Sequence, residues 1–257
     1  MTPDFFNLAP EGLGWITPEG LGWILAAAFV GGLVRGFSGF GTAMVFLPVA
    51  APFLGPFGAI LALTIMDLFG PLPNLRRAWG AVEKPDLWRL LTGCALALPV
   101  GLWVLTRVQP EVFRYAVSFV SLGMVAVLLL GLRYRGTVRR TMVAVIGAAA
   151  GLLGGVAGIP GPVVILFYMS RPLPVAVIRA TILLFLFFFD ILIVGYMTGM
   201  GRVTVPGAAL GLVLAVPNVA GNWLGGRLFC PDQERLYRAA AYVMIALAAL
   251  SGLPVWG

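Results

Sequence analysis

The sequence GGVAGIPGP at residues 154–162 interrupts an apolar segment that runs from residue 141 to residue 169. A similar stretch, GFSGFGT at residues 36–42, interrupts the apolar segment 21–54. Glycine lowers helix stability and proline removes a backbone hydrogen-bond donor, so neither stretch suits the interior of a helix. Backbone groups freed at membrane depth are tolerated only where they face protein or a water-filled cavity. The two stretches therefore predict two broken helices that line a cavity inside a membrane.

The hydrophobic composition places the whole chain in a membrane. Of its 257 residues, 60% are hydrophobic and 11% are charged, whereas a soluble domain is about half apolar and about a quarter charged. The apolar residues form eight segments, and most of these reach the roughly 20 residues needed to cross about 30 Å of hydrocarbon. We therefore expect an all-α polytopic membrane protein, in which residues 1–257 form a single membrane domain. The eight segments are 21–54, 57–75, 87–106, 112–132, 141–169, 174–198, 203–226 and 236–256.

Charge and missing motifs exclude several classes of function. A net charge of +7 would indicate nucleic acid binding in a soluble protein. Here the arginines lie mainly in short links between apolar segments, so they indicate membrane topology instead. The chain has no histidine, no P-loop sequence and no G-x-S-x-G nucleophile elbow. We therefore expect no enzyme activity, no cofactor, no metal site and no nucleic acid partner.

The two halves of the chain resemble each other. Residues 32–40 align with residues 151–159, and residues 59–64 align with residues 176–181. Three further blocks match between the halves: a proline followed by a tryptophan, a proline followed by an arginine, and a single glycine. The offset between the halves stays between 117 and 121 residues. A chance match would not hold this offset over five blocks, so we infer a duplicated unit of about 120 residues.

The basic residues indicate how repeat one (residues 20–132) and repeat two (residues 139–253) are oriented. If all eight segments cross the membrane, the two faces receive nine and seven basic residues, a weak bias. If the first and fifth segments are re-entrant hairpins, the faces receive thirteen and three, the asymmetry typical of a cytoplasmic face. Each repeat then has one broken, re-entrant helix and three transmembrane helices, which makes the repeats inverted and puts both termini outside. The thirteen are Arg76, Arg77, Lys84, Arg89, Arg133, Arg135, Arg139, Arg140, Arg171, Arg179, Arg227, Arg235 and Arg238, and the three are Arg107, Arg114 and Arg202.

The broken helices predict an anion site at the midplane of the membrane. After each break the next half-helix starts near Thr42 or Pro162, and its N-terminus would present free N–H groups and the positive end of the helix dipole. The alternative is that the glycines only allow helices to pack closely. Their occurrence at matching positions of the two halves favours the anion site. The substrate-binding residues expected at the breaks are Ser38, Gly39, Gly41, Thr42, Gly158 and Gly161.

Four charged residues lie in or beside apolar segments, where a charge is costly and usually functional. We expect Arg35 either to bind an oxyanion through its guanidinium fork or to form a structural ion pair with Asp67 or Asp190. We expect each aspartate either to neutralise an arginine or to carry a proton. Arg179 either lines the cytoplasmic entrance of the site or extends to the lipid headgroups.

Asn218 and Asn222 complete the set of candidate substrate-binding residues. They are four residues apart beside Pro217, so they share one helix face. We expect their side chains to hydrogen-bond either the substrate or a neighbouring helix. With Arg35 and Arg179 they are the candidates that lie outside the two breaks.

The motifs around both breaks, together with Arg179-Ala180-Thr181, resemble those of the sulfite exporter TauE/SafE family, also called the toluene sulfonate uptake permease family. The resemblance extends over roughly residues 20–252. It implies a secondary transporter, an exporter of sulfite, sulfonates or related small anions, in a bacterial-type inner (plasma) membrane. This sequence has Gly154 where repeat one has Arg35, so equal roles for the two breaks are not expected.

Two other classes of function stay open at this point. A passive anion channel would need a continuous pore, whereas a transporter closes its site from each side in turn as the repeats move against each other. A purely structural membrane subunit would leave Arg35 and the paired breaks without a role. The expected partners are a small anion and the lipid bilayer, and a homodimer is compatible with all three classes.

Overall fold

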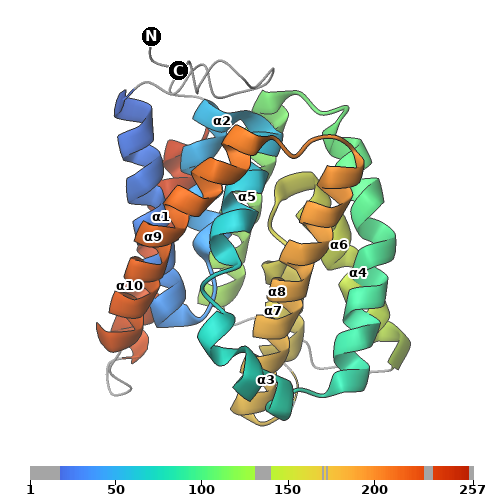
Figure 1. Cartoon of the computed structure of the whole chain (residues 1–257). Coiled ribbons are helices and arrows are strands. Elements are labelled where there is room, and N and C mark those ends of the chain that lie inside the picture. The colour runs from blue at the N-terminus through green and yellow to red at the C-terminus, as the bar shows by residue number, and fades with distance from the viewer. Residues whose placement is uncertain (1–17, 131–139, 170, 172, 229–233, 255–257) are drawn as a thin grey trace.

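The computed structural model describes residues 18–130, 140–169, 171, 173–228 and 234–254, and these residues form a bundle made only of helices (Figure 1). Six helices, namely α1, α2, α4, α5, α8 and α9, are long and apolar enough to cross a membrane. The prediction of an all-α polytopic membrane protein is therefore confirmed. The elements are α1 (Pro18–Ser38), α2 (Thr42–Asp67), the 3-10 helix η1 (Leu72–Asn74), α3 (Leu75–Ala81), α4 (Lys84–Leu105), α5 (Pro110–Leu129), α6 (Arg140–Ala157), α7 (Gly161–Met169), α8 (Val175–Gly199), α9 (Val205–Leu228) and α10 (Glu234–Ser251).

Helix α2 joins the end of the first apolar segment to most of the second. Gly55 lies within it at φ 65° and ψ 175°, a conformation that glycine adopts far more readily than any other residue. Pro56 follows directly, and the residue before a proline is disfavoured in helical backbone. The boundary expected near residue 55 is therefore a kink between two half-helices. The second half ends at Asp67 rather than at residue 75, because a turn, η1 and α3 follow it.

Signals in the sequence set the starts of α4 and α5. Glu83 has an extended backbone before α4, and a proline occupies the first turn of that helix together with Asp86. Helix α5 starts at Pro110 with Glu111 in its first turn. Proline fits the first turn because its missing N–H has no helical partner there, and acids complement the positive end of the helix dipole.

Two helix pairs, α1 with α9 and α4 with α6, make the most extensive contacts in the structure. Glycines permit this close approach. A methyl group at Gly32 would lie 2.1 Å from the carbonyl oxygen of Asn218, and one at Gly93 would lie 2.0 Å from that of Ala144. Because neither position has room for a side chain, the helix backbones touch directly, as small residues allow in membranes.

Large apolar side chains cover the outer surface of the bundle. Leu96 and Trp103 on α4 are 75% and 58% exposed, and Val216 and Trp223 on α9 are 72% and 57% exposed. Water would not solvate such a surface well, whereas lipid tails match it. These faces of α4 and α9 are therefore the ones that a bilayer would cover.

The basic residues gather at one end of the bundle. Helix α3, which carries Arg76 and Arg77, lies at the lower end of Figure 1, next to the start of α4 at Lys84. The α4–α5 link with Arg107 and the α8–α9 link with Arg202 lie at the upper end. Within the described part of the chain, these two groups of basic residues therefore lie at opposite ends of the bundle. Three of the residues counted in the topology prediction, Arg133, Arg135 and Arg139, lie outside the described residues.

Candidate functional site

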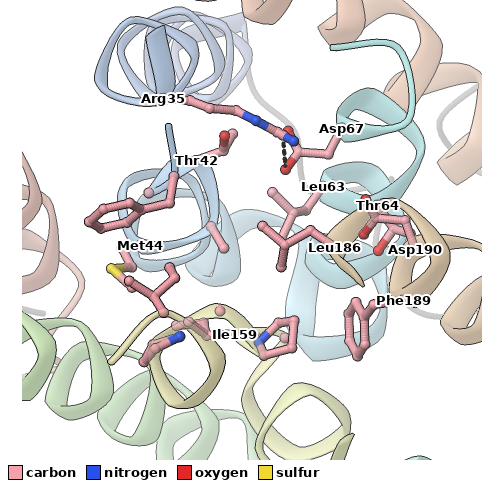
Figure 2. Close-up of a pocket in the computed structure, with 18 residues that line it drawn as sticks. Arg35, Thr42, Met44, Leu63, Thr64, Asp67, Ile159, Leu186, Phe189 and Asp190 are labelled. Atoms are coloured by element: carbon pink, nitrogen blue, oxygen red, sulfur yellow. Dashed lines mark ion pairs between the residues drawn. The ribbon is translucent and has the colours of Figure 1, made fainter. Parts of the chain in front are cut away.

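A small cavity lies where the two predicted breaks meet (Figure 2). Residues 40–44 form one side and residues 158–162 form another. The second half of α2 and the middle of α8 complete the lining. The cavity volume is about 50 Å³, and a water molecule needs about 10–15 Å³ of such space. The cavity is therefore the size of a few water molecules or of one compact ion.

The first break is a tight turn between α1 and α2. Gly39 has φ 81° and donates its N–H to the Arg35 carbonyl oxygen over 2.7 Å, which ends α1. The Ser38 hydroxyl lies 2.8 Å from the Val34 carbonyl oxygen and 2.6 Å from that of Phe40, and its single hydrogen can be donated to either one. Gly41, with φ 107°, then allows α2 to start at Thr42. The Ser38 hydroxyl is therefore bound by the backbone of the turn, and its side chain does not line the cavity.

Helix α2 starts with two backbone donors free of helical partners. The N–H groups of Met44 and Val45 donate to the Gly41 carbonyl oxygen, so those of Thr42 and Ala43 precede the first helical bond. Both residues line the cavity. The first turn of α2 thus offers N–H groups and the positive end of a helix dipole at the cavity wall.

The second break repeats this backbone pattern. Gly158 has φ 70° and donates its N–H to the Gly154 carbonyl oxygen over 2.8 Å, which ends α6. Helix α7 begins at Gly161, which lines the cavity together with Pro160 and Pro162. The two prolines have no N–H group, so this helix start presents fewer donors than that of α2.

Arg35 and Asp67 form an ion pair at the cavity. The distance from Nη1 of Arg35 to Oδ2 of Asp67 is 2.8 Å, and the side chains are 9% and 15% exposed. Figure 2 shows the pair above the cavity, with Thr42 beside it. Of the alternatives expected for Arg35, the pairing with Asp67 is therefore the one that the structure contains. The other oxygen of Asp67, Oδ1, is buried and not held by Arg35, and the buried Thr42 hydroxyl interacts with the Asp67 carboxyl group.

Asp190 lies in the cavity wall on α8 and is 8% exposed. It has no ion pair within the described part of the chain. Thr64, which shares the wall, donates its hydroxyl to the Ile60 carbonyl oxygen over 2.7 Å. The cavity therefore contains one paired and one unpaired carboxyl group.

Five of the predicted site residues lie outside the cavity lining, and Ser38, described above, is one of them. Gly39 is exposed in the turn, and Arg179 is exposed near the start of α8. Asn218 is buried, and its side-chain amide donates to the Ala28 carbonyl oxygen over 3.4 Å. The main-chain carbonyl oxygen of Asn222 faces Gly36 in the same α1–α9 interface, whereas its side-chain amide nitrogen lies beside Gly70. The Asn218 side chain thus contacts a neighbouring helix, the second of the two expected alternatives.

The structure brings together Arg35, Gly41, Thr42, Gly158 and Gly161 with both aspartates, as the sequence predicts, and it adds residues that the sequence analysis did not select. Thr64 could have been selected from the sequence, because it aligns with Thr181 in the second half. The apolar lining residues could not, since the same residue types also face lipid. The main additions to the lining are Phe40, Met44, Thr64, Leu186 and Phe189.

A cavity between two helix breaks, inside a bundle of helices long enough to cross a bilayer, is the architecture of a multi-pass membrane transport protein. The chain belongs to the sulfite exporter TauE/SafE family, whose model matches residues 24–251. The resemblance seen in the motifs is therefore confirmed, and the family is one of transporters. The comparisons with curated proteins and with solved structures found no match.

Proposed function

We propose that the protein is a secondary transporter that exports a small sulfur-containing anion, such as sulfite or a compact sulfonate, and binds it in the cavity between the two breaks. One observation carries this proposal: the Arg35 guanidinium and the N-terminal turns of α2 and α7 all line the same cavity. A guanidinium and free N–H groups at helix starts are the donors that oxyanions prefer. Membership of a sulfite exporter family supports the sulfur chemistry.

The size of the cavity favours a compact anion. Its volume of about 50 Å³ corresponds to a few water molecules, which leaves no room for an aromatic ring. An aromatic sulfonate would require Phe40, Leu186 and Phe189 in the wall to move apart. We therefore rank sulfite and methanesulfonate above toluenesulfonate as substrates.

The duplicated architecture is part of the proposal, and matching contacts support it. Gly36 packs against Gly225 of α9, and a methyl group at Gly36 would lie 2.8 Å from the Gly225 Cα. Gly155 packs against Gly101 of α4 with the same 2.8 Å separation. Gly36 and Gly155 occupy aligned positions in the two halves. Two aligned glycines thus serve the same kind of helix contact, as repeats of about 120 residues would produce.

The breaks are best described as the tips of two hairpins that enter from opposite ends of the bundle. Helix α6 runs alongside α4 in the same direction, since Gly93 meets Ala144 and Gly101 meets Leu152. Arg171, which follows α7, pairs with Asp86 in the first turn of α4. Helix α6 therefore starts, and α7 ends, at the end where α4 begins. This arrangement supports a re-entrant hairpin at the second break.

The other hairpin has the opposite direction. Helix α1 runs alongside α9 in the same direction, because Gly32 meets Asn218 and Gly36 meets Gly225. In Figure 1, α9 starts at the upper end, so α1 enters there. Helix α2, which is kinked at Gly55, is labelled at that end as well. We assign the lower, more basic end to the cytoplasm.

A transport assay tests the proposal. Purified protein is reconstituted into liposomes loaded with sulfite, and efflux is measured with and without an imposed pH gradient. A transporter accumulates anion against its gradient when a second gradient drives it, and it gives saturable rates. Ohmic anion current without accumulation would favour the alternative of a passive channel.

Ligand-induced stabilisation gives an independent measurement. A ligand that binds only the folded state stabilises it by about 2.7 kcal/mol when its concentration is 100 times its Kd. We expect sulfite and methanesulfonate to raise the melting temperature more than toluenesulfonate, acetate or chloride. Equal shifts for all five anions would contradict a sulfur-specific site.

A further inference from the structure

The charges around the cavity do not favour an anion unless one of them changes. Among the described residues that line it, Arg35 is the cation, and Asp67 and Asp190 are acids. With all three ionised, the lining has a net negative charge. Charges interact strongly where water is scarce, so a second anion beside two carboxylates would be repelled. Binding of an anion therefore requires neutralisation of a carboxylate.

Asp67 is the acid that an incoming anion would compete with directly. Its carboxylate already accepts a hydrogen bond from the Arg35 guanidinium at 2.8 Å. A carboxylate and a sulfur oxyanion are both acceptors of the same guanidinium donors, so they exclude each other at Arg35. Asp190 has no ion pair in the described part of the chain, and anion binding would remove no partner from it.

We propose that the anion displaces Asp67 from Arg35 and that Asp67 takes up a proton in the same step, so that each anion moves with one proton. This inference rests on the proposed function. The proton comes from the aqueous side to which the cavity is open, forms an O–H bond at Asp67, and leaves on the other side after the anion is released. A monovalent anion and one proton together carry no net charge.

The surroundings of Asp67 fit this role. Oδ1 of Asp67 is the oxygen that Arg35 does not hold, so it is the one available to the proton. The Thr42 hydroxyl at the start of α2 is 2% exposed and interacts with the Asp67 carboxyl group. The other groups that face Asp67 are Arg35 from α1, Asp190 from α8 and the Asn222 amide of α9 near Gly70. None of these provides a second cation that could hold the Asp67 carboxylate after displacement.

Calorimetry of methanesulfonate binding to the purified full chain tests the proposal, because this anion keeps one charge at all pH values used. Titrations in two buffers with different ionisation enthalpies report the protons taken up. We expect about one proton per anion, and an affinity that falls about tenfold for each unit rise in pH where Asp67 is ionised. In Asp67→Asn the proton uptake should vanish and the affinity should become independent of pH.

One variant serves as the control. Asp86→Asn removes another buried, ion-paired carboxylate, which lies outside the cavity and contacts Arg89 and Arg171. This variant should keep the proton uptake of the unmodified chain. Asp190→Asn instead tests which of the two acids in the cavity takes up the proton, and the uptake persists in this variant if that acid is Asp67. If Asp67→Asn does not fold, Asp67→Glu retains an acid and should show the same uptake as the unmodified chain.

Three results would overturn this inference and leave the proposed function intact. These are binding without proton uptake in the unmodified chain, uptake that persists in Asp67→Asn, and uptake that is lost in Asp190→Asn. A folded protein that neither binds nor transports any sulfur anion would instead overturn the proposed function itself.

Discussion

The two breaks have the same backbone conformation but different side chains. Gly39 and Gly158 both adopt left-handed φ angles, of 81° and 70°, and both close onto the carbonyl oxygen four residues earlier. In the first break that carbonyl belongs to Arg35, and in the second it belongs to Gly154. A methyl group at Gly154 would lie 2.5 Å from the Phe189 ring, so that position has no room for an arginine.

This difference shows how two breaks with the same backbone turn can supply different side chains to one cavity. The shared turns place two helix starts against one cavity. The two breaks contribute different groups to the cavity. The first supplies the guanidinium of Arg35 and the hydroxyl of Thr42, and the second supplies glycine and proline. Substitutions at matching places in the two breaks should therefore have unequal effects.

The largest effect is expected from Arg35→Ala. It removes the charged donors of the site, and a hydrogen bond to a charged group contributes about 1.5–3 kcal/mol. We expect sulfite affinity to fall about 100-fold, measured by calorimetry. The variant also leaves Asp67 buried without its cation, which should lower the free energy of unfolding by about 3–5 kcal/mol. The double variant Arg35→Ala with Asp67→Ala should recover the stability but not the affinity. Unchanged affinity in a folded Arg35→Ala protein would remove Arg35 from the site.

A smaller effect should separate the two helix starts. Gly41 has φ 107°, and a methyl group there would lie 2.9 Å from Cγ1 of Val34. Gly161 has no left-handed φ, and its nearest neighbour would be Cδ1 of Ile165 at 3.4 Å. Gly41→Ala should therefore lower the free energy of unfolding by about 1–3 kcal/mol, whereas Gly161→Ala should change it by less than about 0.5 kcal/mol. Thermal melting in detergent measures both, and equal losses would contradict the structural difference.

Ser38 should contribute less, and only to stability. Its hydroxyl lies within hydrogen-bond distance of two carbonyl oxygens of the first turn, whereas Ala157, at the aligned position of the second break, has no hydroxyl. Ser38→Ala should lower the free energy of unfolding by about 1 kcal/mol and leave sulfite affinity unchanged. Ser121→Ala is the matched control, because the Ser121 hydroxyl is buried without a partner, and it should cost almost nothing. A loss of affinity in Ser38→Ala would place its hydroxyl on the substrate.

The smallest effect is expected from Arg179→Ala. This arginine is exposed near the start of α8 and does not line the cavity. Its removal should change the free energy of unfolding by less than about 0.5 kcal/mol, as for most surface substitutions. Sulfite affinity, measured in the same titrations as for Arg35→Ala, should stay within about twofold, a change of about 0.4 kcal/mol. A tenfold loss would show that Arg179 acts on the anion from the entrance.

The features predicted best from the sequence are those whose physical cost does not depend on their neighbours. Glycine and proline disturb a helix in any context, so both breaks were predicted at the right residues. A charge in an apolar segment is costly wherever it lies, which led to Arg35, Asp67, Asp190 and Arg179. The first three line the cavity, whereas Arg179 does not.

The features that escaped prediction depend on how each helix is rotated. Asn218 was suited to either a substrate or a helix, and only the packing of α9 on α1 shows that its amide faces Ala28. Phe189 and Leu186 line the cavity, while Ile191 on the same helix is 46% exposed. All three are apolar residues of one apolar segment, so the direction in which each points is decided by contacts between distant parts of the chain.

The glycine contacts that join α1 to α9 and α4 to α6 also limit how the protein can move. Each pair links a helix of the first half of the chain to a helix of the second half, with backbone against backbone. The two halves cannot separate as blocks without pulling both pairs apart. In the proposed transport cycle the pairs α1–α9 and α4–α6 should therefore each stay together, with one helix from the first half of the chain and one from the second. The boundary between the moving parts would then run across the two halves of the chain rather than between them.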